Sequence, residues 1–299
     1  MLQFKPLTID DKKEADRYLK ATNTRMCEHC FTDLFIWSRY FGTEICFADD
    51  FLFVKSGTNT NTPHYLAPIG FGNMAHGLQL LLEHASQNNL SFPLYGISAE
   101  IKAEIEAAMP GKFTFEEMRD KADYIYRAND LITLSGKKLH SKRNFINRFM
   151  KENADRYKFR EIDDDNIDDV LEFHKKWCIM NECGDDESLR GERCAAIAGL
   201  KYRRELSLLT GVLYLDGEII AYSFGTQMSE DTVDIQIEKA DHTIYGAYPM
   251  INRLFAERHC RNVEFINREE DMGLEGLRKS KLSYNPEFLL MKYRAVPKE

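Results

Sequence analysis

The order of predicted helices and strands repeats once along the chain, and this repeat constrains the fold more than any single motif. The spacing of apolar residues predicts a strand, two helices, three strands, a helix, a strand, a helix and two strands in the first half. After a basic helix, nearly the same order begins again. Because a recurring order of elements indicates duplicated domains, we predict one unit over residues 1–135 and a second over residues 136–299.

Composition supports a folded chain and limits its partners. Hydrophobic residues make up 43% of the 299 residues and aromatic residues 12%, which is enough for two packed cores. The net charge of −8 argues against DNA as a partner, although a local basic patch is still compatible with RNA. Seven cysteines at irregular spacing predict free thiols rather than a disulfide framework.

The sequence shows no signal for a membrane or for export. No apolar run approaches the roughly 18 residues that a spanning helix requires. Residues 1–6 also lack the apolar core of a signal peptide. We therefore expect a cytoplasmic chain without a transmembrane segment.

The predicted order matches that of the Gcn5-related N-acetyltransferase (GNAT) fold. We therefore expect an α+β protein with tandem GNAT domains, each a mixed and mostly antiparallel sheet flanked by helices. In GNAT folds, backbone amides after the fourth strand cradle a pyrophosphate at a helix N-terminus. The corresponding turns are residues 67–72 and 243–248, where Gly246 and Tyr248 are candidate ligand contacts. Short glycine motifs are unspecific, and an ordinary strand-to-helix turn is the favoured alternative for both.

A basic helix is predicted between the two units, over Lys137–Asn153. Six of residues 137–151 are Lys or Arg, and none is acidic. One face is apolar, but Lys142 falls inside it, and a buried lysine needs a partner or a function. The alternatives are a solvated basic face and a site for phosphate, a nucleotide or tRNA. The candidate binding residues are Lys138, His140, Lys142, Arg143, Asn144 and Asn147.

Two segments of the second unit carry candidate catalytic residues. The strand Thr232–Glu238 alternates apolar and polar residues, so we expect one buried and one polar face. On that polar face Gln236 is a candidate for substrate binding and Glu238 for the general base; a solvated strand face is the alternative. His242 follows the strand and can titrate near neutral pH, and Asn252 on the next helix is a further candidate contact.

The stretch Asn267–Tyr284 mixes acidic and basic residues with two glycines and is predicted to be helical. Its start lies at the C-terminal end of the strand Val263–Ile266, which is the usual ligand crevice of an open sheet. Pairing of Glu275 with Arg278 or Lys279 would explain some of these charges without a function. The candidate site residues are Asn267, Arg268, Glu269, Asp271, Arg278, Lys281 and Tyr284.

One Cys-x-x-Cys motif occurs, at Cys27 and Cys30. A structural zinc site needs about four ligands, and no second pair lies at zinc-finger spacing. We therefore expect no metal.

Two longer motifs resemble a bacterial family related to the C-terminal domain of phosphatidylglycerol lysyltransferase, which has a dual GNAT-like fold. The resemblance spans the whole chain and rests on the following residues: Lys137, Lys138, His140, Lys142, Arg143, Asn144, Ile146 and Asn147; and Asn267, Arg268, Glu269, Asp271, Gly273, Gly276, Leu277, Arg278, Lys281, Ser283, Tyr284 and Pro286. It implies aminoacyl transfer from a charged tRNA, as in that lysyltransferase and the similar Fem peptidoglycan transferases. The lipid-modifying enzymes carry membrane helices and this sequence shows none, which is a departure from the pattern expected for phosphatidylglycerol as the acceptor.

The leading hypothesis is an acyl or aminoacyl transferase with its active site in the second unit. Glu238, Glu269 or His242 would remove a proton from the acceptor, and Tyr284 would protonate the leaving group. The donor would be aminoacyl-tRNA, and the acceptor a small molecule, a peptide or a lipid headgroup. Two alternatives are an N-acetyltransferase that uses acetyl-CoA and a non-catalytic module that binds a nucleotide, RNA or peptide.

Overall fold

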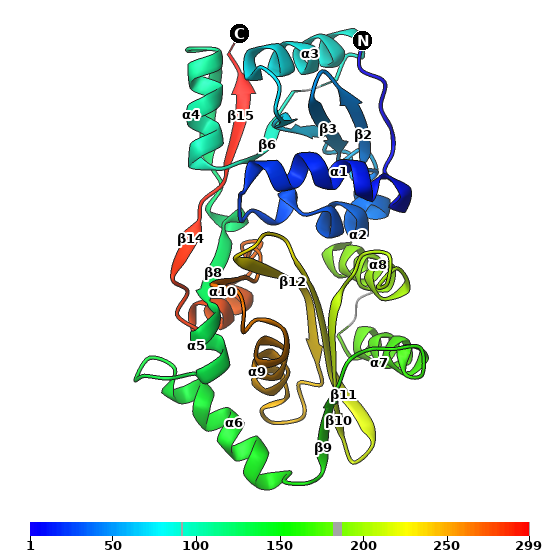
Figure 1. Cartoon of the computed structure of the whole chain (residues 1–299), viewed down its shortest axis with the longest axis vertical. Coiled ribbons are helices and arrows are strands. Elements are labelled where there is room, and N and C mark those ends of the chain that lie inside the picture. Colours follow the sequence, from blue (N-terminus) through cyan, green and yellow to red (C-terminus); the bar gives the residue numbers. More distant parts are fainter. Residues whose placement is uncertain (91, 182–186, 299) are drawn as a thin grey trace. The chain divides into compact units, whose positions relative to one another are not determined.

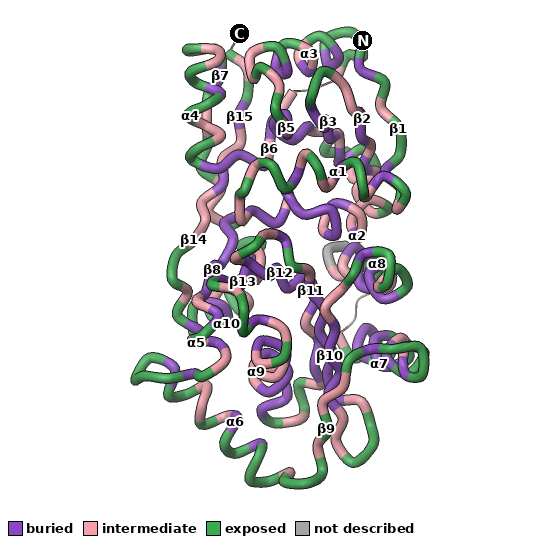
Figure 2. The backbone as a smooth tube through the Cα atoms, viewed as in Figure 1, coloured by how far each residue is buried: buried purple, intermediate pink, exposed green. Residues whose placement is uncertain are grey.

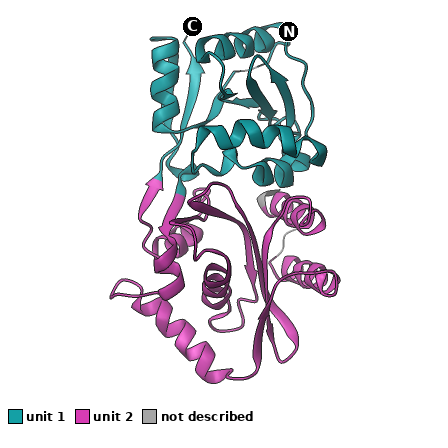
Figure 3. Cartoon of the chain, in the orientation of Figure 1, with its two compact units in different colours: residues 1–123, 290–299 teal, residues 124–289 magenta. Residues whose placement is uncertain are grey.

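A computed structural model describes residues 1–90, 92–181 and 187–298, and it divides the chain into two units (Figures 1 and 3). Unit 1 comprises residues 1–123 and 290–299, and unit 2 comprises residues 124–289. The predicted boundary at residue 135 therefore differs from the boundary in the structure. The last ten residues also belong to unit 1 and not to unit 2.

Unit 1 is built on an eight-stranded sheet. Its strands, in sheet order, are β1 (Lys5–Pro6), β2 (Glu44–Ala48), β3 (Phe51–Ser56), β4 (His64–Leu66), β6 (Leu94–Ile97), β15 (Tyr293–Pro297) and β7 (Phe113–Glu117), with β5 (Ile69–Gly70) paired to β3. Its α-helices are α1 (Lys12–Leu19), α2 (Phe31–Phe41), α3 (Met74–Gln87) and α4 (Ala99–Ala108). Phe51, Phe53 and Leu78 lie in its apolar core.

Unit 2 is built on a seven-stranded sheet. Its strands, in sheet order, are β14 (Phe288–Leu290), β8 (Asp123–Arg127), β13 (Phe265–Asn267), β12 (Thr232–Ala240), β11 (Glu218–Gln227), β10 (Leu209–Leu215) and β9 (Tyr157–Arg160). Its helices are α5 (Ala128–Thr133), α6 (His140–Glu152), α7 (Ile167–Met180), α8 (Glu187–Lys201), α9 (Ala247–His259) and α10 (Glu275–Leu282). Both sheets are mixed and mostly antiparallel and are flanked by helices, as predicted.

Strand pairing explains why the unit boundary differs from the predicted one. β8 was expected to close the first unit, but it pairs with β13 and so joins the sheet of unit 2. The predicted final strand Phe288–Tyr293 is two strands: β14 pairs with β8, and β15 pairs with β6 and β7 in unit 1. Hydrophobic periodicity predicts where strands form, but the sheet that each strand joins depends on long-range pairing.

Helix α9 packs against the sheet of unit 2 through a regular apolar stripe. Ala247, Met250, Ile251 and Phe255 recur at helical spacing and are buried. Figure 2 shows buried and partly buried stretches alternating along this helix. Helix α6 adds Ile146 and Phe149 to the same core, as its predicted apolar face requires. Met150 was expected on that apolar face but is 38% exposed.

The pairing of β12 with β13 is short, and this shortness creates the site described below. The two strands are parallel and pair from Thr232 with Phe265 to Asp234 with Asn267. β13 ends there, whereas β12 continues to Ala240 along β11. The chain after β13 forms an irregular segment, residues 268–274, before α10 begins. This segment was predicted to be helical, but Glu269, Met272 and Gly273 have positive φ values, which end any helix.

Candidate functional site

A buried ion pair lies where β12 and β13 separate. Arg268, the first residue after β13, donates from Nη2 to Oε1 of Glu238 on β12 at 3.1 Å. Asn252 on α9 donates from Nδ2 to the other carboxylate oxygen at 2.8 Å. The Arg268 and Glu238 side chains are 12% and 11% exposed. Burial opposes the charge of Arg268, but Glu238 favours it, and the pKa of the guanidinium is raised overall. The site therefore holds a fixed charge pair at low dielectric.

Two buried polar atoms beside this pair make no hydrogen bond within the described parts of the chain. They are Oδ1 of Asn252 and Nη1 of Arg268. One is an acceptor and the other a donor, and each belongs to a side chain whose other polar atom contacts Glu238. Because buried polar groups in proteins are nearly always paired, these two atoms are candidate contacts for a polar ligand.

Tyr284 and Lys142 complete the cluster. The ring of Tyr284 lies 4.9 Å from Cζ of Arg268 and 4.1 Å from Nζ of Lys142. Burial raises the pKa of the Tyr284 hydroxyl, so Tyr284 keeps its proton at neutral pH. Burial, together with the charge of Arg268, lowers the pKa of Lys142 to about 8, and Glu238 opposes this shift in part. Lys142, the basic residue predicted inside an apolar helix face, thus projects into the site.

Tyr126 of β8 contacts the same cluster and was missed by the sequence analysis. Its ring lies 5.7 Å from Cζ of Arg268, and burial raises the pKa of its hydroxyl. The strand containing Tyr126 was recognised, but it was assigned to the first unit, so its side chain was not considered for a site in the second.

Strand β12 does not have the solvated polar face that simple alternation suggested. Of its nine residues only Glu238 is not fully buried. Its pairing with β11 shifts register between Phe224 and Thr226, which is a bulge opposite Gly225. Beyond the bulge, Glu238 contacts α9 while Lys239 forms an ion pair with Glu192 of α8. Gln236 donates to Asp234 at 2.9 Å, so these two side chains form a buried polar pair on the same strand.

Several predicted residues of the second motif hold residues 268–274 in place. Asp271 accepts hydrogen bonds from Arg278, from Tyr124 and from the Gly273 amide. Burial opposes the charge of Asp271, but these donors outweigh it and lower the pKa of the carboxyl group. Arg278 therefore pairs with Asp271, whereas pairing with Glu275 was considered from the sequence. Asn267 accepts from the Glu269 amide at 2.6 Å, and Lys281 donates to backbone carbonyls of the same segment.

Helix α6 presents a mixed surface. Arg143 donates to the carbonyls of Leu134 and Gly136 and so caps the end of α5. His140 contacts both Arg143 and Asn144. Lys138, in the turn before α6, is exposed, as are His140, Asn144 and Asn147. Of the six predicted binding residues, the structure therefore places Lys142 in the site, Arg143 in a cap and the other four on the surface.

The two glycine turns fit their local packing. A Cβ atom on Gly70 would lie 2.3 Å from the Asp50 carbonyl, and one on Gly72 would lie 2.3 Å from the Phe51 ring. Gly246, at the start of α9, has φ of 83°, and a Cβ there would lie 3.0 Å from the Phe145 carbonyl of α6. Helix α6 thus packs directly on the turn where a GNAT fold would hold a pyrophosphate.

The remaining predicted residues lie apart from the ion pair. His242 is exposed on the loop before α9. Tyr248 packs near Trp177 and Ala240, and burial raises its pKa to about 12. Glu269 is partly buried in the segment after β13. The structure therefore brings together Glu238, Arg268, Asn252, Lys142 and Tyr284.

Unit 1 contains a second buried charged cluster. Lys292 lies 2.7 Å from Glu28 and 2.8 Å from Asp123, and it donates to the Cys27 thiol at 3.3 Å. Cys27, Glu28 and Asp123 are the described residues arranged so that they could hold a metal ion. The ammonium of Lys292 contacts all three of them, so it already supplies the positive charge. Cys30, the second cysteine of the Cys-x-x-Cys motif, is not part of this group.

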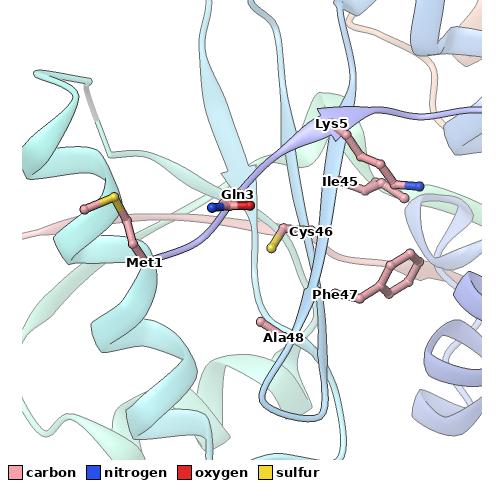
Figure 4. A pocket seen from close by; sticks show the side chains of 7 residues that line it. All are labelled: Met1, Gln3, Lys5, Ile45, Cys46, Phe47 and Ala48. Atoms are coloured by element: carbon pink, nitrogen blue, oxygen red, sulfur yellow. The ribbon is translucent and has the colours of Figure 1, made fainter.

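The described cysteines are free, as predicted, and Cys183 lies outside the described residues. A shallow hollow of about 370 Å³ lies along β1 and β2 of unit 1 (Figure 4). Gln3, Lys5 and Cys46 supply the polar atoms of its lining, and they form no cluster like that of unit 2. In the described part of the chain, no helix is both long and apolar enough to cross a bilayer.

Comparison with known proteins agrees with this architecture. The family described as phosphatidylglycerol lysyltransferase, C-terminal, matches residues 20–296. The chain belongs to this family. A protein of unknown function from Bacteroides thetaiotaomicron is 38% identical and superposes with a TM-score of 0.94 over 100% of both chains. An uncharacterised protein from Mycoplasmoides gallisepticum is 30% identical over 57% of this chain, which spans about half of that relative (54%).

More distant structures show the fold. A chain from Agrobacterium fabrum, described as the C-terminal domain of a lysylphosphatidylglycerol synthetase, is 14% identical, with a TM-score of 0.67 over 97% of this chain and 93% of its own. A GNAT-family acetyltransferase from Colwellia psychrerythraea is 9% identical, with a TM-score of 0.54 over 100% of both chains. Family and fold together support a GNAT-like acyltransferase related to the lysylphosphatidylglycerol synthetase C-terminal domain.

Proposed function

We propose that this member of the phosphatidylglycerol lysyltransferase family transfers an aminoacyl group from an ester donor, such as charged tRNA, to an amine or hydroxyl acceptor. The observation that carries the proposal is the pair of buried, unbonded atoms beside Glu238, namely Asn252 Oδ1 and Arg268 Nη1. An aminoacyl ester offers an ammonium donor and a carbonyl acceptor one carbon apart. Its ammonium suits Glu238 and Asn252, and its carbonyl oxygen suits Arg268.

The charge of Arg268 has a direct use in this reaction. When the acceptor attacks the ester carbon, negative charge develops on the carbonyl oxygen. A fixed guanidinium in a buried site stabilises that charge without reorganisation, and one such donor is typically worth about 10²–10³ in rate. Glu238 holds the guanidinium in place and balances its charge before substrate binds.

Proton transfer falls to Lys142 and Tyr284. With a pKa of about 8, a fraction of Lys142 is a neutral amine near neutral pH and can accept the proton of the attacking group. Tyr284 keeps its proton because burial raises its pKa, so it can donate to the leaving ester oxygen. The products are the aminoacylated acceptor and the free hydroxyl of the donor. Glu238 is therefore assigned to binding rather than to the general base.

Lys138, in the turn before α6, and the exposed basic residues of α6 are proposed to contact the phosphates of the donor. These contacts would not depend on the nucleotide sequence of the donor, because phosphate contacts depend on charge. The same helix weighs against acetyl-CoA as the donor, since its Phe145 packs on the Gly246 turn. We therefore expect CoA at millimolar concentration to leave the unfolding temperature unchanged, because only a ligand that binds the native state raises it.

The test is transfer from a pool of radiolabelled aminoacyl-tRNAs to amines and hydroxyls in a lysate of small molecules, peptides and lipids. Unmodified aminoacyl-tRNA is expected to react, and N-acetylated aminoacyl-tRNA, which lacks the ammonium, is the matched control and is expected to react at least ten-fold more slowly. Equal rates with both donors would contradict the role of Glu238 and Asn252. No transfer from any donor would overturn the proposal and favour a non-catalytic binding module.

A further inference from the structure

The segment after β13 wraps three backbone carbonyls around one ammonium. The carbonyl oxygens of Arg268, Glu269 and Glu270 all accept hydrogen bonds from Nζ of Lys281 on α10, at 3.1 Å for Glu269. Lys281 is only 8% exposed. Three consecutive carbonyls do not face one point in a strand, where they alternate. Here Glu269 adopts a φ of 54°, which turns the backbone and makes them converge.

This arrangement has the composition of a cation site. Carbonyl oxygens are hard ligands of the kind that bind alkali and alkaline-earth ions, and the three N–H donors of an ammonium match three such oxygens. Burying a lysine is costly, so its presence inside the segment indicates that the carbonyls need a positive charge to converge. A solvent-exposed lysine would not place its ammonium among the three carbonyls.

The three carbonyls around the Lys281 ammonium, called the carbonyl cage below, also fix Arg268 and the residues that contact it. The Arg268 carbonyl is bound by Lys281, and its amide donates to the Tyr124 carbonyl at 3.1 Å. The backbone of Arg268 is therefore held on both sides, which aims its guanidinium at Glu238. The carbonyl of Lys281 itself accepts from the Tyr126 hydroxyl at 2.8 Å and from the Tyr284 amide at 3.1 Å. Lys281 thus connects the segment to both aromatic residues that flank Arg268.

We propose that Lys281 is a positioning residue whose ammonium serves as a built-in structural cation, and that the carbonyl cage binds a free alkylammonium or monovalent cation when the side chain is removed. The cage holds Arg268 in the geometry that the proposed transfer requires. The activity arm of the test below therefore rests on the proposed function, whereas the binding arm does not.

The experiment uses the full chain with Lys281→Ala, which leaves a space of the length of propylammonium. Its unfolding temperature is expected to fall and then to recover in a saturable manner on addition of propylammonium, with methylammonium and potassium chloride weaker at equal ionic strength. The transfer rate is expected to fall by about 10²-fold, the size of effect that a misplacement of roughly 1 Å produces, and to recover over the same concentration range. The wild-type protein serves as the control for non-specific salt effects.

Lys281→Met is the matched variant, because it fills the space without charge and leaves no room for a free amine. It is expected to lose transfer and to show no recovery. If Lys281→Ala fails to fold, Lys281→Gln carries the test, since it offers two N–H donors without charge and is expected to react at least ten-fold more slowly than wild type.

The outcomes separate the two proposals. Absence of any selective effect of propylammonium on the unfolding temperature of Lys281→Ala, or wild-type rates for Lys281→Gln, would overturn the structural-cation role. Recovery of the unfolding temperature in a protein that shows no transfer at all would support the cage and count against the proposed function alone.

Discussion

Each unit buries a positively charged side chain next to a carboxylate, Lys292 in unit 1 and Arg268 in unit 2, yet the two clusters differ in how far their polar atoms are satisfied. In unit 1, Lys292 contacts Glu28, Asp123 and Cys27, and the Cys27 amide also donates to Asp123. In unit 2, Arg268 and Asn252 hold Glu238 but each keeps one polar atom without a hydrogen bond among the described residues. A closed network stabilises a fold, whereas an open one has room for a ligand. We therefore place the proposed function in the unit 2 cluster, and the experiments below test this contrast between the units.

The largest expected effect on stability is in unit 1. Lys292→Met removes the ammonium that contacts the buried Asp123 carboxylate and its neighbour Glu28. Removal of one partner from a buried pair typically costs about 3–5 kcal/mol. We expect a loss of this size in the free energy of unfolding of unit 1, with an unchanged transfer rate per folded molecule. Denaturant titration can resolve the units separately, since Trp37 lies in α2 and Trp177 in α7.

Lys292→Met combined with Asp123→Asn is the control for that experiment, because the amide removes one uncompensated charge. It is expected to recover part of the lost stability. A single variant as stable as wild type would show that Lys292 is not needed to balance the cluster, and the contrast between the units would then fail.

In unit 2 the largest expected effect is on rate rather than stability. Asn252→Leu removes the unbonded Oδ1 together with one hydrogen bond to Glu238. Loss of the hydrogen bond destabilises the fold, whereas removal of the unbonded buried oxygen stabilises it. The free energy of unfolding is therefore expected to change by less than about 1 kcal/mol. The transfer rate is expected to fall by about 10²-fold. A stability loss of several kcal/mol with little change in the transfer rate would mean that the unit 2 cluster, like that of unit 1, stabilises the fold.

These contrasts also show how far the sequence alone could lead. The periodicity of apolar residues and the two motifs indicated the GNAT-like fold and the region around Glu238, Arg268 and Tyr284. They did not indicate that β8 joins the second sheet, because strand pairing between distant segments leaves no local periodic signal. Tyr126 was missed for that reason. The roles of Arg143 and Lys281 were equally hidden, since both bind backbone carbonyls, which have no counterpart in side-chain patterns.

A smaller effect concerns pH. The pKa of Lys142 is about 8 in the folded protein and about 10.4 in an unfolded chain. Between these values the unfolded state binds more protons, so the contribution of Lys142 to stability rises with pH from about 8 to about 10. The transfer rate is expected to rise with pH to a plateau above about 8, as Lys142 becomes a neutral amine facing Arg268, Glu238 and Tyr284.

Lys142→Arg separates charge from proton transfer, because arginine stays protonated. Single-turnover rates between pH 6 and about 9, corrected for spontaneous ester hydrolysis, are expected to be lower and to lose the rise with pH. If the transfer rate of Lys142→Arg rose with pH at the same midpoint as that of wild type, the titrating group would be one other than Lys142.

The smallest expected effect distinguishes Lys138, in the turn before α6, from Arg143 within the helix. Lys138 is exposed, whereas Arg143 caps the carbonyls of Leu134 and Gly136. Lys138→Ala is expected to weaken tRNA binding modestly and to reduce the slope of log binding constant against log salt by about 0.7–0.9, as for one lost phosphate contact. Arg143→Ala is expected to leave that slope unchanged and instead to lower the free energy of unfolding of unit 2 by about 1 kcal/mol. Filter binding at several salt concentrations, alongside denaturant titration, measures both. If Arg143→Ala changed the salt slope and Lys138→Ala did not, Arg143 would itself contact the donor. The ligand-binding residues would then extend from the cluster around Glu238 to the start of α6.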